Sequence, residues 1–407
     1  MDLFKRCYEY KRVEEAKAMG IYPYFRALSS APDNVVTMEG GRKIMLGSNN
    51  YLGLTTDRRT KDAAIAAVEQ YGTGCSGSRF LNGTLTIHLE LERALADFLQ
   101  KDDCIIFSTG FQSNLSIISA ITDRNDVILT DSMNHASIVD GTRLSFARTI
   151  KYRHNDMEDL ERLLKKHAEE TRGGILVITD GVFSMEGEIC NLPEIVRLKK
   201  KYNARLLIDD AHAIGVLGDH GRGTAEHFGL TEDVDLIMNT FSKTLASLGG
   251  CVVGETKVIE YIRHTARPFI FSASIPPAQV AAARRSLEIL IEEPWRVARL
   301  HEIAAYMREK LSALPHIRLH DSGNTLVPII PIKTGTVMCT LKIANELFAA
   351  GVYVNSVLPP AVAEEDCLLR TSFTATHTNE QLDEAAEIIG KVFTEFADDP
   401  FCAGCLP

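Results

Sequence analysis

The sequence alternates short apolar runs with longer amphipathic stretches, and this alternation limits the folds available to the chain more than any other feature. The runs are four to seven residues long and rich in β-branched side chains, as expected of strands buried on both faces of a sheet. They are CIIF (104–107), DVILTD (126–131), GILVITD (174–180), RLLIDD (205–210), DLIMN (235–239) and GCVVG (250–254). Charged amphipathic stretches such as 157–171 and 192–203 lie between them and predict crossover helices. The pattern predicts an α/β fold with a mostly parallel sheet.

The pattern changes near Trp295, where a long helical stretch is followed by TLVPIIPI (325–332) and a charged helix from about residue 379. This change predicts a smaller α+β domain after the parallel sheet. We therefore expect an N-terminal arm over 1–45, a large domain over 46–290 and a small domain over 291–407. The sequence does not say which domain the arm packs against.

Composition excludes several classes of partner. The chain has 407 residues, of which 45% are hydrophobic, and this is enough to form two cores. The formal net charge of −10 argues against nucleic acid or an anionic membrane surface as a general partner. We find no secretory leader and no apolar stretch near the ~20 residues of a membrane span, so we expect a cytoplasmic protein without a transmembrane segment.

The nine cysteines are an odd number without a framework spacing, which predicts reduced thiols, most of them in the core. Cys402 and Cys405 form a C-x-x-C near the chain end. A metal site would need two further ligands, and no paired Cys or His cluster offers them. We therefore expect no metal and a frayed tail.

Polar residues follow several of the predicted strands, at the sheet edge where ligands bind in open α/β folds. CIIF is followed by Ser108, Thr109, Gly110 and Phe111 and then by a predicted helix. Free backbone N–H groups at the start of a helix can hold a phosphate. This motif is weak alone, because most strand-to-helix turns contain Gly or Ser for reasons of turn geometry.

Three further strand ends add other chemical groups. DVILTD leads to His135, RLLIDD ends in Asp209 and Asp210 followed by His212, and DLIMN leads to Thr240, Ser242 and Lys243. Each has an ordinary interpretation when taken singly: a packed histidine, an aspartate that caps a helix, or a solvated lysine.

The convergence of these groups favours a pyridoxal 5′-phosphate site. A lysine amine can form an imine with the aldehyde, and burial beside cationic or apolar neighbours makes it nucleophilic near neutral pH. A carboxylate keeps the pyridine nitrogen protonated, so that the ring withdraws electrons from the substrate Cα. Hydroxyls and helix N–H groups hold the phosphate. This argument alone permits any enzyme that uses the cofactor.

The chain resembles the α-oxoamine synthases, a branch of the fold-type I, aspartate aminotransferase-like enzymes, over nearly its whole length. The resemblance rests on seven motifs in the same order: SNNYLGL (48–54), GTGCSGSRFLNGT (72–84), NHAS (134–137), DGVFSMEG (180–187), DDAH (209–212), TFSK (240–243) and RPFIFSASIPP (267–277). It implies a large domain with a mostly parallel seven-stranded sheet and a smaller α+β C-terminal domain.

The resemblance also implies roles for individual residues. The implied catalytic residues are Lys243 as the imine-forming amine, Asp209 on the pyridine nitrogen, His212 on the phenolic oxygen and His135 stacked on the ring. The implied phosphate-end residues are Thr109, Gly110, Phe111, Thr240 and Ser242, with Ser184 close to the cofactor. Active sites of this family lie at a homodimer interface, which implies an obligate dimer in which the partner subunit supplies Ser272, Ser274 and Asn50. Arg370 occupies the position of an arginine that binds the substrate carboxylate, and its alternative interpretation is an ordinary arginine at a strand end.

The implied reaction is a decarboxylating condensation of an amino acid with an acyl-CoA thioester. Lys243 removes the Cα proton, the carbanion attacks the thioester, and the β-keto acid loses carbon dioxide. The motifs at 19–26, 78–84 and 271–277 are most similar to those of bacterial serine palmitoyltransferases, which implies L-serine and palmitoyl-CoA as substrates. Glycine C-acetyltransferase and 8-amino-7-oxononanoate synthase share part of these motifs and stay open as alternatives. Other open alternatives are transamination, aldol cleavage and a non-catalytic partner subunit, although the last is expected to lack Lys243.

Overall fold

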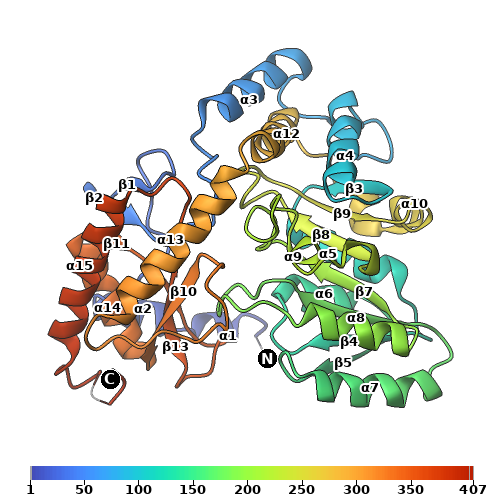
Figure 1. Cartoon of the computed structure of the whole chain (residues 1–407). Helices are drawn as coiled ribbons and strands as arrows, with labels where there is room; N and C mark the ends of the chain where they lie inside the picture. The colour runs from blue at the N-terminus through green and yellow to red at the C-terminus, as the bar shows by residue number, and fades with distance from the viewer. Residues whose placement is uncertain (1, 403, 407) are drawn as a thin grey trace. The chain divides into compact units, whose positions relative to one another are not determined.

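The structure is a computed structural model that describes residues 2–402 and 404–406, and the chain forms two compact units (Figure 1). Unit 1 comprises residues 1–48, 303–321 and 329–407, and unit 2 comprises 49–302 and 322–328. The N-terminal residues thus group with the C-terminal part of the chain, a question that the sequence left open. The domain boundaries at 45 and 290 stay a prediction.

Unit 2 contains a seven-stranded sheet in which only β9 runs antiparallel to its neighbours. In spatial order the strands are β3 (Asp103–Phe107), β9 (Gly250–Gly254), β8 (Leu236–Thr240), β7 (Arg205–Asp209), β6 (Ile175–Asp180), β4 (Val127–Asp131) and β5 (Arg148–Tyr152). The mostly parallel sheet and six of its strands are confirmed. The sequence analysis missed β5, an edge strand that pairs only with β4 and in which only Tyr152 is buried.

Helices cover both faces of this sheet (Figure 1). One apolar cluster joins the sheet to α5 (Gly110–Ile121), α6 (Ala136–Leu144), α10 (Thr256–Thr265) and α11 (Arg267–Ile270). The predicted crossover helices, α7 (Met157–Glu170) and α8 (Leu192–Lys201), contact the same strands from outside that cluster. The other helical elements of unit 2 are α3 (Arg58–Tyr71), α4 (Thr86–Phe98), α9 (Thr224–His227), the 3₁₀ turn η1 (Thr231–Asp233) and α12 (Pro277–Glu292).

Polar residues at the strand ends cap the helices that follow, and this fixes where those helices begin. Thr109 Oγ1 accepts a hydrogen bond from Gln112 N at the start of α5. His135 Nδ1 accepts one from Ser137 N at the start of α6. A side-chain cap satisfies a donor that the helix leaves unpaired. The side chains that define the helix starts therefore lie at the carboxyl edge of the sheet.

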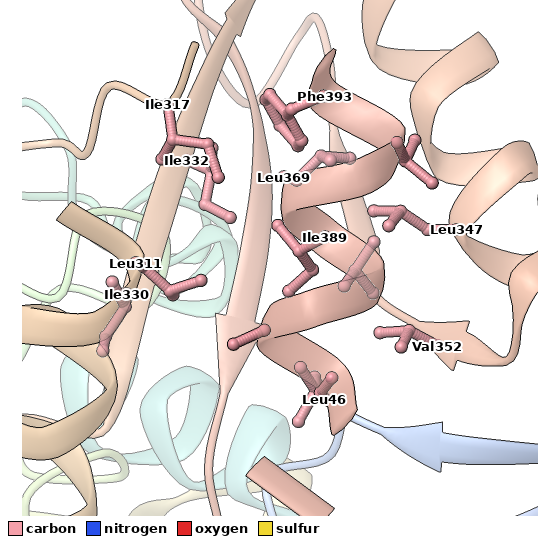
Figure 2. Packing of buried hydrophobic residues seen from close by; sticks show 14 of the residues in the cluster. Leu46, Leu311, Ile317, Ile330, Ile332, Leu347, Val352, Leu369, Ile389 and Phe393 are labelled. Atoms are coloured by element: carbon pink, nitrogen blue, oxygen red, sulfur yellow. The ribbon is translucent and has the colours of Figure 1, made fainter. Parts of the chain in front are cut away.

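Unit 1 is built from two small sheets and their helices. One sheet has the order β1 (Val35–Met38), β2 (Gly41–Met45) and β11 (Val352–Tyr353), and the other has β10 (Ile329–Gly335), β13 (Cys367–Ser372) and β12 (Asn355–Val357). Its helices are α1 (Lys5–Tyr8), α2 (Arg12–Ala18), α14 (Val337–Ala350) and α15 (Asn379–Phe396), together with the second half of α13 (Trp295–Ser312). Figure 2 shows the core, where apolar side chains of the second sheet, including Ile330, Ile332 and Leu369, pack against Ile389 and Phe393 of α15.

The C-terminal tail of unit 1 differs from the expectation. Cys402 is fully buried in the core and forms a disulfide with Cys339 of α14. The expectations of a frayed tail and of reduced thiols throughout are therefore wrong at these two positions. The C-x-x-C motif of Cys402 and Cys405 carries no information about Cys339, which lies 63 residues before Cys402. Cys104, Cys190, Cys251 and Cys367 are buried free thiols, as expected of small core residues.

Within residues 2–402 and 404–406, no helix has both the length and the apolar character that a membrane crossing requires. The same residues contain no group of three or more His, Cys, Asp or Glu side chains placed to hold a metal ion.

Candidate active site

A cavity of about 260 Å³ opens at the carboxyl edge of the unit 2 sheet, where the polar strand-end residues meet. Nine of the predicted site residues line it: Thr109, Gly110, Phe111, His135, Asp209, His212, Thr240, Ser242 and Lys243. They come from the ends of β3, β4, β7 and β8. Residues of four strand ends that are distant in the sequence thus surround one concave space, as open parallel sheets require of a ligand site.

One end of the cavity is suited to a phosphate group. Gly110 begins α5, and a Cβ atom at this position would lie 2.6 Å from both Cβ and Oγ1 of Thr240. Only glycine therefore allows the helix start to approach β8 this closely. Thr240 Oγ1 lies 2.9 Å from Ser242 Oγ, so two hydroxyls gather beside the first N–H groups of α5. Those N–H groups have no intrahelical acceptor and favour an anion.

Asp209 is held at the floor of the cavity by two fixed donors. Asn114 Nδ2 donates to Asp209 Oδ2 at 2.8 Å, and Ala211 N donates to Oδ1 at 3.0 Å. Asn114 also donates to Ser137 Oγ at 2.8 Å, which ties α5 to the start of α6. The sequence analysis missed Asn114 and Ser137. The only signal for Asn114 was an amide in an otherwise apolar helix, in the first turns after the phosphate motif.

Asp180 also lines the cavity and was missed as a site residue. It ends β6 directly opposite Asp209 on β7, so the two carboxyl groups are neighbours at the sheet edge. Burial and the nearby Asp209 raise the pKa of Asp180 well above its usual range. Both effects disfavour a negative charge on Asp180. Its position at a strand end, like that of Asp209, was the available signal.

The two imidazoles of the cavity are each oriented by a hydroxyl group. His135 Nδ1 lies 2.7 Å from Ser137 Oγ, and burial followed by the charge of Lys243 lowers the pKa of His135, although Asp209 opposes this. A neutral ring that lines the cavity can stack on a flat ligand. His212 Nδ1 lies 2.7 Å from the hydroxyl of Tyr51, which belongs to the SNNYLGL motif. This contact brings the N-terminal motif to the DDAH motif.

Lys243 lines the cavity from the short connection between β8 and the antiparallel β9. The connection folds back on itself, because Phe241 N donates to Gly249 O and Ser247 N donates to Phe241 O, both at 2.9 Å. Ala246 N donates to the carbonyl oxygen of Lys243 at 3.0 Å. The backbone that carries the amine is therefore held on both sides.

Five predicted residues do not line this cavity. Ser272 and Ser274 lie beside a small void of about 10 Å³ in unit 2, and Asn50 Oδ1 accepts from Leu54 N at 3.0 Å and Thr55 N at 3.3 Å. Ser184 lies in the segment after β6. Arg370 belongs to unit 1, where it is 4% exposed on β13. The predicted roles of Ser272, Ser274 and Asn50 involve a partner subunit. These roles, and those of Ser184 and Arg370, stay predictions.

A larger cavity of about 680 Å³ lies at the opposite edge of the same sheet, where β6, β7 and β8 begin. Several of its charged residues bind one another or the backbone. Lys101 Nζ donates to Thr231 O at 2.6 Å and Val234 O at 2.7 Å, and Arg205 Nη1 pairs with Asp235 Oδ1 at 2.7 Å. These groups stabilise the connections at this edge, and the convergent set of amine, carboxylate, imidazoles and hydroxyls belongs to the smaller cavity.

His154 forms a charged cluster next to the segment that follows β6. Its Nδ1 lies 2.9 Å from Asp131 Oδ1, and its Nε2 lies 3.1 Å from Glu188 Oε2. The ring packs edge-on against Phe183, with centroids 4.4 Å apart. Burial lowers the pKa of His154, but the hydrogen bonds to Asp131 and Glu188 outweigh it and raise the pKa to about 10. A protonated imidazole therefore ties the end of β4 to the segment after β6.

We expect the substitution His154→Gln to lower the free energy of unfolding by about 2–4 kcal/mol near pH 6, because it leaves the buried Asp131 and the partly buried Glu188 without their cation. Since the folded-state pKa is raised, this stabilisation is complete below the ordinary histidine pKa of about 6.5 and is lost as the pH rises through about 10. Urea unfolding of both proteins at pH 6, 8 and 10 measures the difference. His264→Gln, at an exposed histidine, is the control and should show almost no pH-dependent difference. A constant His154 effect across this range would contradict the charged state.

The cavity residues fit pyridoxal phosphate in each part that the cofactor requires. The lining combines one lysine amine, a fixed carboxylate, a neutral imidazole that can stack, and hydroxyls at a helix N-terminus. The close approach of Gly110 to Thr240 keeps the phosphate end narrow. This donor set matches an aldehyde, a pyridine nitrogen, an aromatic ring and a phosphate group.

Known proteins are similar to this chain over almost its whole length. Residues 41–389 match the family described as aminotransferase class I and II. The chain is 50% identical over 393 residues to a serine palmitoyltransferase of Sphingobacterium spiritivorum, covering 97% of each protein. It is 43% identical over 382 residues to an 8-amino-7-oxononanoate synthase of Thermoanaerobacter pseudethanolicus, covering 94% of this chain and 95% of that protein. A solved structure of SPT with a PLP internal aldimine is similar with a TM-score of 0.93 and 33% identity, covering 97% of this chain and 99% of that one.

Proposed function

The chain belongs to the aminotransferase class I and II family, and from this premise we propose that it condenses L-serine with palmitoyl-CoA in a decarboxylating reaction. The fold is that of the fold-type I enzymes, and the chain is a pyridoxal phosphate-dependent acyltransferase. The observation that carries the choice of substrates is the 50% identity to a serine palmitoyltransferase over 97% of both proteins. The related 8-amino-7-oxononanoate synthase reaction, supported by 43% identity, is the alternative.

The cofactor and the cavity residues divide the chemistry between them. When bound, pyridoxal phosphate supplies an aldehyde that takes up an amine and a ring that withdraws electrons from the substrate Cα. Thr109, Gly110, Thr240 and Ser242 would bind its phosphate, and Asp209 would hold a proton on its ring nitrogen. His135 would cover one face of the ring. These contacts would keep the ring still while the amine at the aldehyde is exchanged.

Lys243 would act as the base of the reaction once the substrate amine has replaced it. Its Nζ would take the proton from the substrate Cα, and the same atom would return a proton to that carbon after carbon dioxide has left. A general base must reach the proton that it removes, and Lys243 lines the cavity into which the substrate must come. His135 would exclude water from the face of the ring that it covers.

Arg370 is proposed to bind the carboxylate of the amino acid. A buried guanidinium can grip a carboxylate with two parallel hydrogen bonds, and Arg370 is 4% exposed on β13. We expect Arg370→Ala to raise KM for L-serine by roughly 10- to 100-fold, because it removes a charge-assisted contact. KM for palmitoyl-CoA should stay within about threefold. Steady-state kinetics with each substrate varied in turn measures the two KM values.

The control for this prediction is Arg318→Ala, which removes an exposed arginine of the same unit. Equal effects of the two substitutions, or an Arg370 effect on palmitoyl-CoA alone, would contradict the proposed role.

The proposal includes a homodimer in which the partner subunit supplies Ser272, Ser274 and Asn50. It is supported by apolar side chains that the single chain leaves in water: Leu248, 47% exposed, and Phe111, 42% exposed, line the cavity, and Phe271, next to Ser272, is 79% exposed. Large exposed apolar groups often mark an interaction surface. The cytoplasmic location stays a prediction.

The substrates can be tested with the purified protein and pyridoxal phosphate. L-serine should shift the visible absorption band of the bound cofactor, and thiol release should be faster with palmitoyl-CoA than with short acyl thioesters. A shift with L-alanine together with a preference for a pimeloyl thioester would favour the alternative. A shift with glycine alone and a preference for acetyl-CoA would instead favour glycine C-acetyltransferase.

A further inference from the structure

Three cysteines of unit 1 gather at the start of α14, away from any role in the proposed reaction. Cys339 lies in the first turn of this helix and is bonded to Cys402. Cys402 is 0% exposed and belongs to the unit 1 core. Cys405 is a free, partly buried thiol that packs against the same core. Two cysteines predicted only as a C-x-x-C thus meet a third from a distant part of the chain.

The tail that carries Cys402 is held on α14 by contacts other than the disulfide. Lys342 Nζ lies 3.0 Å from Asp399 Oδ2 and 4.1 Å from the centroid of the Phe401 ring. Phe401 N donates to Asp399 Oδ1 at 2.8 Å. Lys342, which makes the contacts with Asp399 and Phe401, lies in the first half of α14. The tail would therefore stay near α14 if the bond between Cys339 and Cys402 opened, which is a requirement for a reversible bond.

Cys405 is partly buried, close to the backbone of Cys402. Its backbone N donates to Cys402 O at 2.9 Å, so the two cysteines occupy one turn. A Cβ atom built on Gly335 would come within 3.0 Å of Cys405 Sγ. Gly335 ends β10 directly before Thr336, the N-cap of α14, whose hydroxyl accepts from Cys339 N. All three sulfur-bearing residues therefore surround the N-terminus of one helix.

We propose that Cys339, Cys402 and Cys405 form a thiol–disulfide exchange site that reacts with low-molecular-weight disulfides such as oxidised glutathione. In its internal step, Cys405 loses a proton and its Sγ attacks Cys402 Sγ. A bond forms between Cys402 and Cys405, the bond between Cys339 and Cys402 breaks, and Cys339 leaves as a thiolate that takes up a proton. This step involves no net oxidation. The N-terminus of α14 favours the departing thiolate, because the helix dipole stabilises negative charge there.

The starting disulfide forms from reduced protein by exchange with the external disulfide. Cys339 and Cys402 each give up one hydrogen and become one disulfide, while one oxidised glutathione is reduced to two glutathione thiols. Excess reduced glutathione reverses the reaction. The external partner thus accepts both electrons, and no metal or oxygen is required.

The chain contains its own control, the buried pair Cys104 and Cys251 on the neighbouring strands β3 and β9. Both are 0% exposed free thiols, and they lie within a continuous sheet. Extended sheet backbone offers neither a turn nor a helix end beside them. These thiols should stay reduced under conditions that oxidise Cys339 and Cys402.

The test uses the full-length protein in buffers with different ratios of reduced to oxidised glutathione. Thiols are then blocked with N-ethylmaleimide in denaturant, so that buried thiols also react, and the peptides are mapped by mass spectrometry. Oxidising buffers should give the Cys339–Cys402 peptide with a minor Cys402–Cys405 species, and Cys104 and Cys251 should be alkylated throughout. Alkylation of both Cys339 and Cys402 in every oxidising buffer would overturn the proposal.

The substitution Cys405→Ser tests the exchange step itself. It should abolish the minor species and slow reductive opening of the Cys339–Cys402 bond by roughly tenfold, because an attacking thiol held in place reacts at a high effective concentration. Cys7→Ser, at an exposed cysteine of the same unit, should leave the rate unchanged. Thermal unfolding of each variant reports on folding. Opening of folded Cys405→Ser protein at the wild-type rate would overturn the role of Cys405.

Discussion

Replacing Lys243 with alanine is expected to reduce turnover by roughly 10⁴-fold or more, because the proposed mechanism makes Lys243 both the cofactor anchor and the base. Lys243 supplies the only side-chain amine among the described residues that line the cavity. The variant should bind pyridoxal phosphate without the visible absorption band of the imine that the wild type forms. Release of thiol from palmitoyl-CoA in the presence of L-serine measures turnover, and absorption spectroscopy measures the band.

Lys165→Ala is the matched control, since it removes an exposed lysine from α7 with the same change in charge. It should retain wild-type activity and absorption. Both variants should unfold at about the wild-type temperature, because Lys243 lies in a loop whose backbone contacts do not depend on its side chain. Substantial turnover by the Lys243 variant would refute the whole assignment of the cavity.

The second large effect is expected from Asp209→Asn, which should lower kcat by roughly 10²- to 10⁴-fold. The amide keeps the shape of the side chain but carries no charge, so it cannot hold a proton on the ring nitrogen of the cofactor. Cofactor affinity should fall much less than kcat, because the proposed phosphate contacts are made by Thr109, Gly110 and Thr240. Steady-state kinetics and fluorescence titration with pyridoxal phosphate separate the two quantities.

Asp210 offers a comparison at the adjacent position. It is fully buried, Thr224 N donates to its Oδ2 at 2.9 Å, and burial raises its pKa to about 7. About half of the Asp210 side chains are therefore already uncharged near neutral pH, as an amide is. Asp210→Asn should keep kcat within about tenfold of the wild type, a far smaller loss than at Asp209. A larger loss of kcat at Asp210 than at Asp209 would show that the proposal assigns the required charge to the wrong carboxylate.

The polar residues at the strand ends were predictable as site residues, because a parallel sheet brings the carboxyl ends of its strands to one edge. Thr109, His135, Asp209 and Lys243 each follow a continuous apolar run, so both the strand and the polar residue after it could be recognised. Asn114 could not be recognised in this way, since it reaches Asp209 from inside a helix and its contact depends on how α5 packs against the sheet.

The misses have two physical causes. Strand β5 has one buried side chain, so it lacks the apolar run that marks the other strands. The bond between Cys339 and Cys402 joins residues 63 apart through the packing of the tail on α14, and neither residue has a local sequence signal for its partner. Contacts between distant segments that are not set by the period of a strand or helix stay outside single-sequence reasoning.

The reversal of direction at β9 sets the Lys243 loop apart from the other loops around the cavity. Those loops lead into helices, whereas this one returns at once to the sheet, with Thr240 and Gly250 paired across it. Its backbone should therefore exchange amide hydrogens slowly and tolerate no inserted residue. The Lys243 amine would then move away from the substrate and back again by rotation about the bonds of its four-carbon side chain, with no hinge in the main chain.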